Sequence, residues 1–161
     1  MHETLGMYHP DSFRTLWSLS KVYDHEGDYA KGEAVCREAM EIFDRNPMMA
    51  PVNAPYADQI IEWLSYYCRK QNDEAGTESA AREWISLLEK HLPEKHTRKM
   101  KAWYNLFSTL YRQKRYTEAY EVSKEALRYT SEHDETSPER CKTTVNLQEW
   151  SIKCQNKMGS K

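Results

Sequence analysis

The sequence predicts an all-α protein built as a stack of helical hairpins, and three observations favour this fold class. Only 5 glycines and 6 prolines occur among 161 residues, which leaves long stretches with the Glu, Lys, Ala, Leu and Arg content of helices. Apolar residues recur at spacings of three and four, as at Leu16, Leu19, Val22 and Tyr23, and this is the period of a helix with one buried face. The chain also matches itself at a fixed shift, and no stretch of alternating polarity indicates a sheet.

Turn-forming segments divide the chain into seven expected helices. Glycine, proline, asparagine or paired charges gather at 25–28, 46–55, 72–76, 92–94, 114–115 and 132–138. The intervals between these breaks give three helix pairs and one leftover helix. We therefore expect a single domain with repeats at about 10–45, 54–92 and 95–132, followed by a final capping helix at about 138–158.

The repeat period is about 43 residues. A shift of 87 places Leu16 on Trp103, Leu19 on Leu106 and Ala39 on Ala126, with size and polarity largely kept. A middle copy matches the first at shifts of 44 and 45, and the first helix alone matches a fourth time at a shift of 131. About three and a half units result, which is near the minimum for a stable stack, and a polar last helix suits an exposed end.

The first copy carries a motif of a known family. It consists of TLGMYHPDS at 4–12, LxxLSxxY at 16–23, GxY at 27–29 and the run from Glu33-Ala34 to Ala39. This motif resembles the kinesin light chain type of tetratricopeptide repeat (TPR), closely over 4–45, well over 97–130 and weakly between. The chain departs from the pattern at Lys114-Arg115, which replaces the turn glycine, and at Trp84, where the family prefers alanine. The resemblance implies a right-handed superhelical α-solenoid of antiparallel helix pairs.

Composition and charge exclude several classes of function. The 12% aromatic content argues against disorder, and the net charge of −2 gives no global attraction to nucleic acid or anionic membranes. No run approaches the roughly 18–20 apolar residues of a membrane span, and the first residues lack the pattern of a signal peptide. The four cysteines, at 36, 68, 141 and 154, form no CxxC pair and are interpreted as reduced thiols. The expected location is cytoplasmic, with the nucleus as the alternative.

No motif for catalysis, a cofactor or a metal occurs in the sequence. GxxxxGK[ST], GxGxxG, HExxH and GxSxG are all absent. His91 and His96 flank Pro93 at a spacing that shares no helical face, so solvated turn histidines are favoured over metal ligands. The Asp24-His25-Glu26 cluster lies at an expected helix end, where polar residues commonly finish a turn. We therefore expect no enzyme, no cofactor and no metal site.

The resemblance also implies where a partner binds. In this family the first helix of each hairpin lines a concave groove, at positions two before and one, five and eight to nine after its leading large residue. Counted from Leu16, Ile60 and Trp103, these positions give the predicted groove: Arg14, Trp17, Lys21, His25, Ile61, Arg69, Lys101, Tyr104, Ser108, Tyr111 and Arg112. The same count also reaches Asp24, Asp58, Ser65 and Cys68.

The expected function is that of a non-catalytic protein–protein interaction module, acting as scaffold, adaptor or sensor. Because the predicted groove is basic and aromatic, an extended peptide with acidic and apolar side chains would complement it. Self-association through the first hairpin is the alternative, since that hairpin would lack a preceding neighbour. RNA binding is weighed for the basic clusters at 95–101 and 112–115 and is disfavoured by the interleaved acids.

Overall fold

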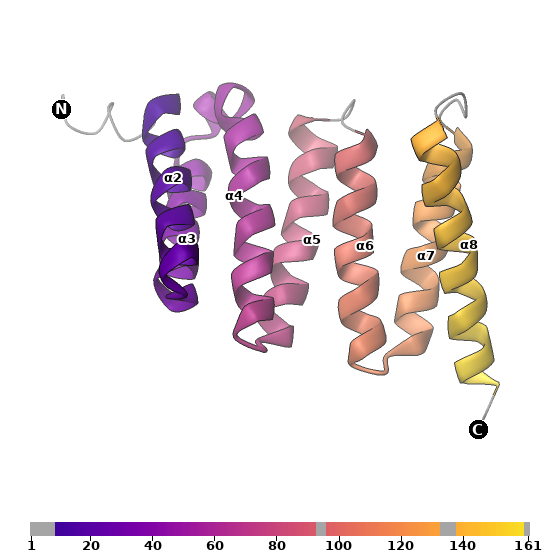
Figure 1. The fold of residues 1–161 in the computed structure, drawn as a ribbon. Helices are drawn as coiled ribbons and strands as arrows, with labels where there is room; N and C mark the ends of the chain where they lie inside the picture. The colour runs from indigo at the N-terminus through magenta and orange to yellow at the C-terminus, as the bar shows by residue number, and fades with distance from the viewer. Residues whose placement is uncertain (1–8, 93–95, 133–137, 160–161) are drawn as a thin grey trace. The chain divides into compact units, whose positions relative to one another are not determined.

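Seven α-helices make up most of the described chain (Figure 1). The computed structural model describes residues 9–92, 96–132 and 138–159. The helices are α2 (Pro10–Glu26), α3 (Tyr29–Arg45), α4 (Ala50–Lys70), α5 (Glu74–His91), α6 (His96–Arg112), α7 (Tyr116–Glu132) and α8 (Pro138–Met158), with a short 3-10 helix η1 (Pro47–Met49). Within these ranges no residue lies in a strand, and the expected all-α class and seven helices are confirmed.

The chain divides into two compact units, residues 1–95 and 96–161. Within the first unit α3 packs against α2 and α4, and α4 against α5; within the second, α7 packs against α6 and α8. The motif residues 4–8, the turns at 93–95 and 133–137, and the side chains of His96 and Cys141 lie outside the described part. No described helix has the length and hydropathy that crossing a bilayer requires.

The turn inside each hairpin ends on a residue in the left-handed conformation, at matching repeat positions. Gly27 has φ 74°, and Asn72 and Lys114 each have φ 60°. The Gly27 N–H donates to the carbonyl of Asp24 at 3.0 Å, which closes α2. Lys114 stands 87 residues after Gly27, so the third copy keeps the backbone shape of the turn without its glycine.

Helix α4 begins four residues before the expected start of the second repeat. The prolines at 47, 51 and 55 predict a break over 46–55, but only η1 separates α3 from α4. Pro51 lies in the first turn of α4, where a backbone N–H has no partner within the helix. Pro55 lies inside α4 and has no N–H, so α4 lacks one intrahelical hydrogen bond there. Ala54 and Ala57 beside it are fully buried, and their packing in the core holds this turn in place.

A tyrosine that inserts between small residues joins the first two hairpins. Tyr67 is fully buried, and its hydroxyl donates to the backbone carbonyl of Ser20 at 2.6 Å. A Cβ on Gly32 would lie 2.8 Å from Cζ of the Tyr67 ring, so only glycine leaves room for the ring at this place. Gly32 of α3 and Tyr67 of α4 thus meet as packing partners, and the tyrosine hydroxyl reaches α2.

The middle hairpin is built around a tryptophan instead of a small residue. Trp84 of α5 is fully buried, and its indole Nε1 donates to Asp58 Oδ1 of α4 at 2.6 Å. The departure from alanine at this position is therefore paired with a buried carboxylate on the facing helix. The bond accounts for the departure from the repeat pattern at position 84.

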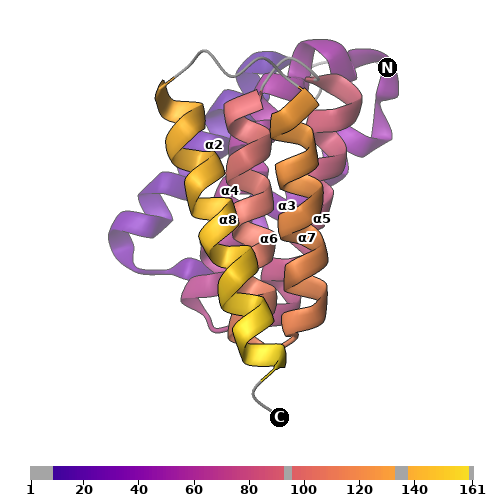
Figure 2. The same ribbon diagram turned by 90° about the vertical axis from the view of Figure 1, so that its right-hand side faces the viewer.

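The second unit closes on its last helix (Figure 2). Leu147 and Cys154 of α8 are buried, as the fourth match of the first-helix pattern predicts. Trp150 stacks on Phe107 of α6 with ring centroids 4.9 Å apart, and Gln155 Nε2 donates to the Tyr120 hydroxyl of α7 at 3.0 Å. The last helix thus takes the place of the first helix of a further hairpin.

Candidate interaction surface

Two of the four predicted groove residues on α2 join it to α4. The Lys21 ammonium lies 3.8 Å from the ring centroid of Trp17 and 6.0 Å from that of Trp63, which are cation–π distances. The Trp17 indole Nε1 is buried and has no hydrogen-bond partner in the described chain. Arg14 and His25 are exposed, and Arg14 pairs with Asp11 at 3.1 Å. Lys21 therefore links Trp17 of α2 to Trp63 of α4.

Ile61 is a core residue and not a groove residue. It is 0% exposed and lies on the stripe of α4 that also holds Asp58 and Cys68. Asp58 accepts the bond from Trp84 of α5, and Cys68 Sγ would lie 3.0 Å from a Cβ on Gly76 of α5. Both ends of the stripe thus face α5, and Ile61 lies between them. Because α4 packs against helices on two sides, its buried arc is wider than the single stripe that the repeat comparison assigned to it.

An aromatic face on α4 was missed by the sequence analysis. It consists of Trp63 and Tyr66, with Tyr29 of α3 beside them, and it is half-buried. The ring centroids of Trp63 and Tyr66 lie 5.3 Å apart, and those of Tyr29 and Tyr66 lie 6.4 Å apart. The repeat shift of 44 places Trp63 on Leu19, which belongs to the apolar stripe that the sequence predicts to be buried. The sequence signal for this face is a second set of large residues at helical spacing on α4, outside the stripe that is buried.

Cations cover the rings of this aromatic face. The Lys70 ammonium lies 5.3 Å from the Tyr66 centroid and 5.6 Å from that of Tyr29, and the Arg69 guanidinium carbon lies 6.0 Å from Tyr66. Arg69, an exposed member of the predicted groove, therefore belongs to the same surface as Lys21. Burial raises the pKa of Tyr66, and the nearby Asp24 carboxylate raises it further.

The remaining predicted groove residues lie together on α6, in the second unit. Lys101, Tyr104 and Arg112 are exposed, and Ser108 and Tyr111 are half-buried on the same face. Tyr104 packs on Trp150 of α8 at 4.5 Å, and Tyr111 stacks on Phe107 at 5.9 Å. The structure thus assembles the predicted residues into two groups, one on α2 and α4 and one on α6.

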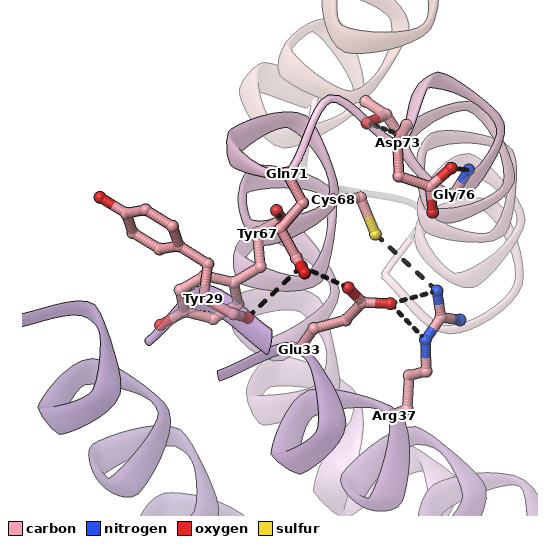
Figure 3. A network of polar contacts seen from close by, with 9 residues as sticks. Tyr29, Glu33, Arg37, Tyr67, Cys68, Gln71, Asp73 and Gly76 are labelled. Atoms are coloured by element: carbon pink, nitrogen blue, oxygen red, sulfur yellow. Dashed lines mark hydrogen bonds and ion pairs between the residues drawn. The ribbon is translucent and has the colours of Figure 1, made fainter. Parts of the chain in front are cut away.

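A polar cluster at the ends of α3 and α4 contains donors that could ligate a metal (Figure 3). One donor atom each from Glu33, Cys68 and Asp73 lies within 4.8 Å of the others. Arg37 already occupies this cluster, with Nη2 2.7 Å from Glu33 Oε1 and 3.8 Å from Cys68 Sγ. Since a guanidinium holds the cation position, the donor set fits a structural clamp better than a metal ion.

The clamp ties three helices together (Figure 3). Gln71 Nε2 donates to the second oxygen of Glu33 at 2.6 Å, and Asp73 Oδ1 accepts from the backbone N–H of Gly76 at 2.9 Å. Asp73 therefore caps the start of α5 while Glu33 on α3 bonds to α4. Each described polar group of this cluster has a structural role, and none is positioned as a nucleophile or a general base.

The described thiols are expected to be inert in the folded chain. Burial raises the pKa of Cys36 to about 12 and that of Cys68 to about 11, and it also raises the pKa of Cys154. At pH 8 the reactive thiolate of Cys36 and of Cys68 is then at least about 100-fold rarer than that of an ordinary cysteine. In a Cys141→Ala background, Ellman's reagent should label the three thiols slowly in buffer and at once in urea. One thiol that reacts rapidly in buffer would contradict this.

Comparison with known proteins supports the fold. No family model and no curated protein matches the sequence. Among solved structures, the chain is similar to a protein of Podosopora anserina described as having nearly identical TPR-like repeats of a kinesin light chain. The two are 11% identical, the match covers 95% of this chain and 90% of that chain, and the TM-score is 0.51. The chain therefore has the fold of an α-solenoid of TPR-like repeats, as its sequence motif predicts.

Proposed function

We propose that the protein is a non-catalytic protein–protein interaction module that captures a peptide segment of a partner on the exposed side of its first-of-pair helices. The observation that carries the proposal is the set of cations held over half-buried rings, with Lys21 on Trp17 and Lys70 on Tyr66. Such a surface offers flat apolar contact together with positive charge, and it suits acidic and apolar side chains. As scaffold, adaptor or sensor, the module would act from a cytoplasmic location.

Charge reversal tests this function on both groups of residues. Arg69→Glu should weaken capture of an acidic partner on the first unit, and Arg112→Glu should weaken it on the second. Each loss is expected to be about tenfold, because a repulsive charge replaces an attractive one at the edge of the contact. The measurement is affinity capture from cell extract with each variant and the double variant, with the retained proteins identified and quantified by mass spectrometry.

Arg45→Glu provides the matched control. Arg45 lies on the second-of-pair helix α3 and pairs there with Glu41 at 3.2 Å, away from the predicted groove. Circular dichroism of every variant shows whether helix content is kept. If the proteins retained by the wild type and by all the variants are the same, the proposed capture on this face is wrong.

Self-association is the second candidate function. Leu19 and Val22 on α2 are 39% and 50% exposed, whereas the matching residues of the second hairpin, Trp63 and Tyr66, are half-buried. An exposed apolar strip of this kind favours contact with another copy. Sedimentation at increasing concentration separates the two functions, since a dimer that Val22→Glu disrupts would support this candidate.

A further inference from the structure

The second unit separates its charges between helices. Helix α6 carries four Lys or Arg residues and no Asp or Glu. The described side chains of α8 include Lys153 and Lys157 against one acid, Glu149. Helix α7 carries four acids and two basic residues, and Glu121 pairs there with Lys124 at 3.1 Å. The acids that follow the basic segments closely in the sequence thus belong to a different helix, and the sides of α6 and α8 stay basic.

Four rings of this unit form a near-parallel row with one exposed end. Tyr104 lies against Trp150 with centroids 4.5 Å apart and planes at 31°, and Trp150 lies against Phe107 at 4.9 Å and 16°. Tyr111 continues the row from Phe107 at 5.9 Å and 27°, and Tyr116 closes that end at 5.2 Å. At the other end Tyr104 is 47% exposed, whereas every other described aromatic residue is buried or half-buried. Trp150 covers one face of the Tyr104 ring, so the opposite face is open to a further flat ring.

Exposed cations lie on both sides of this open ring along the helices. Lys101 lies one turn before Tyr104 on α6, and Arg112 lies two turns after it. On α8, Lys153 lies one turn after Trp150. Proteins hold single strands of nucleic acid in this way, with bases stacked on aromatic rings and phosphates near cations. We infer that the α6–α8 side of the second unit binds single-stranded nucleic acid, with one base stacked on Tyr104 and phosphates beside these cations.

This binding goes beyond the proposed function, because it adds a second class of ligand to peptide capture. An acidic peptide offers negative charge too, but its aromatic anchors gain most in fully desolvated pockets. Tyr104 is 47% exposed and offers a ring face instead. Every nucleobase has such a flat face, and a strand brings one negative charge with every phosphate. The open ring therefore fits a base better than a peptide side chain.

Binding of labelled strands tests the inference. The probes are fluorescein-labelled oligouridine, oligothymidine and an abasic chain, each of about 12 nucleotides, a length within the site sizes of single-strand binders. A labelled glutamate-rich peptide of equal negative charge represents the other class of ligand. Binding is measured by fluorescence anisotropy at rising salt, and circular dichroism checks the helix content of every variant. The full chain is used as wild type, Tyr104→Ala, Tyr104→Phe, Lys153→Gln and Lys124→Gln, the last changing an exposed lysine of α7 as the matched control.

At least one of the two base-bearing strands should bind the wild type about tenfold more tightly than the abasic chain, because only bases can stack on Tyr104. Tyr104→Ala should remove this advantage, and Tyr104→Phe should keep it. The slope of log affinity against log salt should be about −2, the value for three neutralised phosphates on a single strand. Lys153→Gln should bring this slope nearer to zero by about 0.7, and Lys124→Gln should leave it unchanged. Tighter binding of oligouridine would assign RNA as the strand, and tighter binding of oligothymidine would assign DNA.

An abasic chain that binds as tightly as both base-bearing strands would overturn the inference, since charge alone would then account for binding. Binding of neither strand, or tighter binding of the glutamate-rich peptide than of either strand, would overturn it too. Equal effects of Lys153→Gln and Lys124→Gln would show that the α6–α8 side is not the site. Capture of partner proteins from nuclease-treated extract is a separate result and tests the proposed function alone.

Discussion

Replacing Trp84 with alanine is expected to lower the free energy of unfolding by about 3–5 kcal/mol, the range for a large aromatic residue truncated in a core. Trp84 is fully buried in α5, and its removal opens a cavity against α4. The change also deletes the bond from Nε1 to Asp58, whose carboxylate is 7% exposed. Urea unfolding followed by circular dichroism would measure the loss as a lower midpoint with an unchanged slope.

Trp84→Phe separates the packing of the ring from its hydrogen bond. Phenylalanine keeps most of the apolar volume but offers no N–H, so we expect a smaller loss of about 1.5–3 kcal/mol, the range for hydrogen bonds to charged groups. If Trp84→Phe unfolds at the wild-type midpoint, the bond to Asp58 contributes nothing and the tryptophan acts by volume alone.

Replacing Gly32 with alanine is expected to lower the free energy of unfolding by about 2 kcal/mol. The added Cβ would lie 2.8 Å from the Tyr67 ring, and crowding of this kind costs about 1–3 kcal/mol. Moving the ring aside also strains the 2.6 Å bond from its hydroxyl to the Ser20 carbonyl, which adds about 1 kcal/mol. The gain of about 1 kcal/mol that alanine brings to a helix interior offsets only part of this cost.

Two further variants test whether the Gly32 penalty comes from the ring. In a Tyr67→Leu background the ring is absent, so Gly32→Ala should become neutral or stabilising. Gly27→Ala should cost about 1–2 kcal/mol in either background, because its φ of 74° is left-handed and no atom lies within 4 Å of the added Cβ. A Gly32 penalty that persists without the ring would show that backbone geometry, and not crowding, requires this glycine.

Most of the fold could be predicted from the sequence because the repeat constrains it several times over. A shift that aligns Leu16 with Trp103 also aligns Gly27 with Lys114, and the structure gives both turn residues the left-handed conformation. The exception is the start of α4, where three prolines indicated a loop. Pro51 fits the first turn of α4, where no backbone N–H is needed, and Pro55 inside the helix is accommodated at the cost of one hydrogen bond.

The candidate surface was harder to predict than the fold. The repeat shift transfers a position along the helix, but it does not show how many neighbours the helix has at that position. The count from Ile60 therefore placed Ile61 in the groove as the counterpart of Trp17, although Asp58 and Cys68 on the same stripe contact α5. The same transfer places Trp63 on Leu19 in the stripe predicted to be buried, whereas Trp63 is half-buried beside Lys21 of α2. The sequence signal for the buried Asp58 was its position on a mainly apolar stripe of one helix, together with Trp84 where the repeat prefers a small residue on the next helix.

The bond from Tyr67 to the carbonyl of Ser20 has a consequence for how such chains diverge. Its acceptor belongs to the main chain, which every residue supplies, so no substitution at position 20 that keeps the side chain small can remove it. At this point the position of α4 against α2 and α3 is thus set by a tyrosine and a glycine and does not depend on the side chain at position 20. At 11% identity the fold is still shared over 95% of this chain, which fits a helix stacking that does not depend on most residue identities.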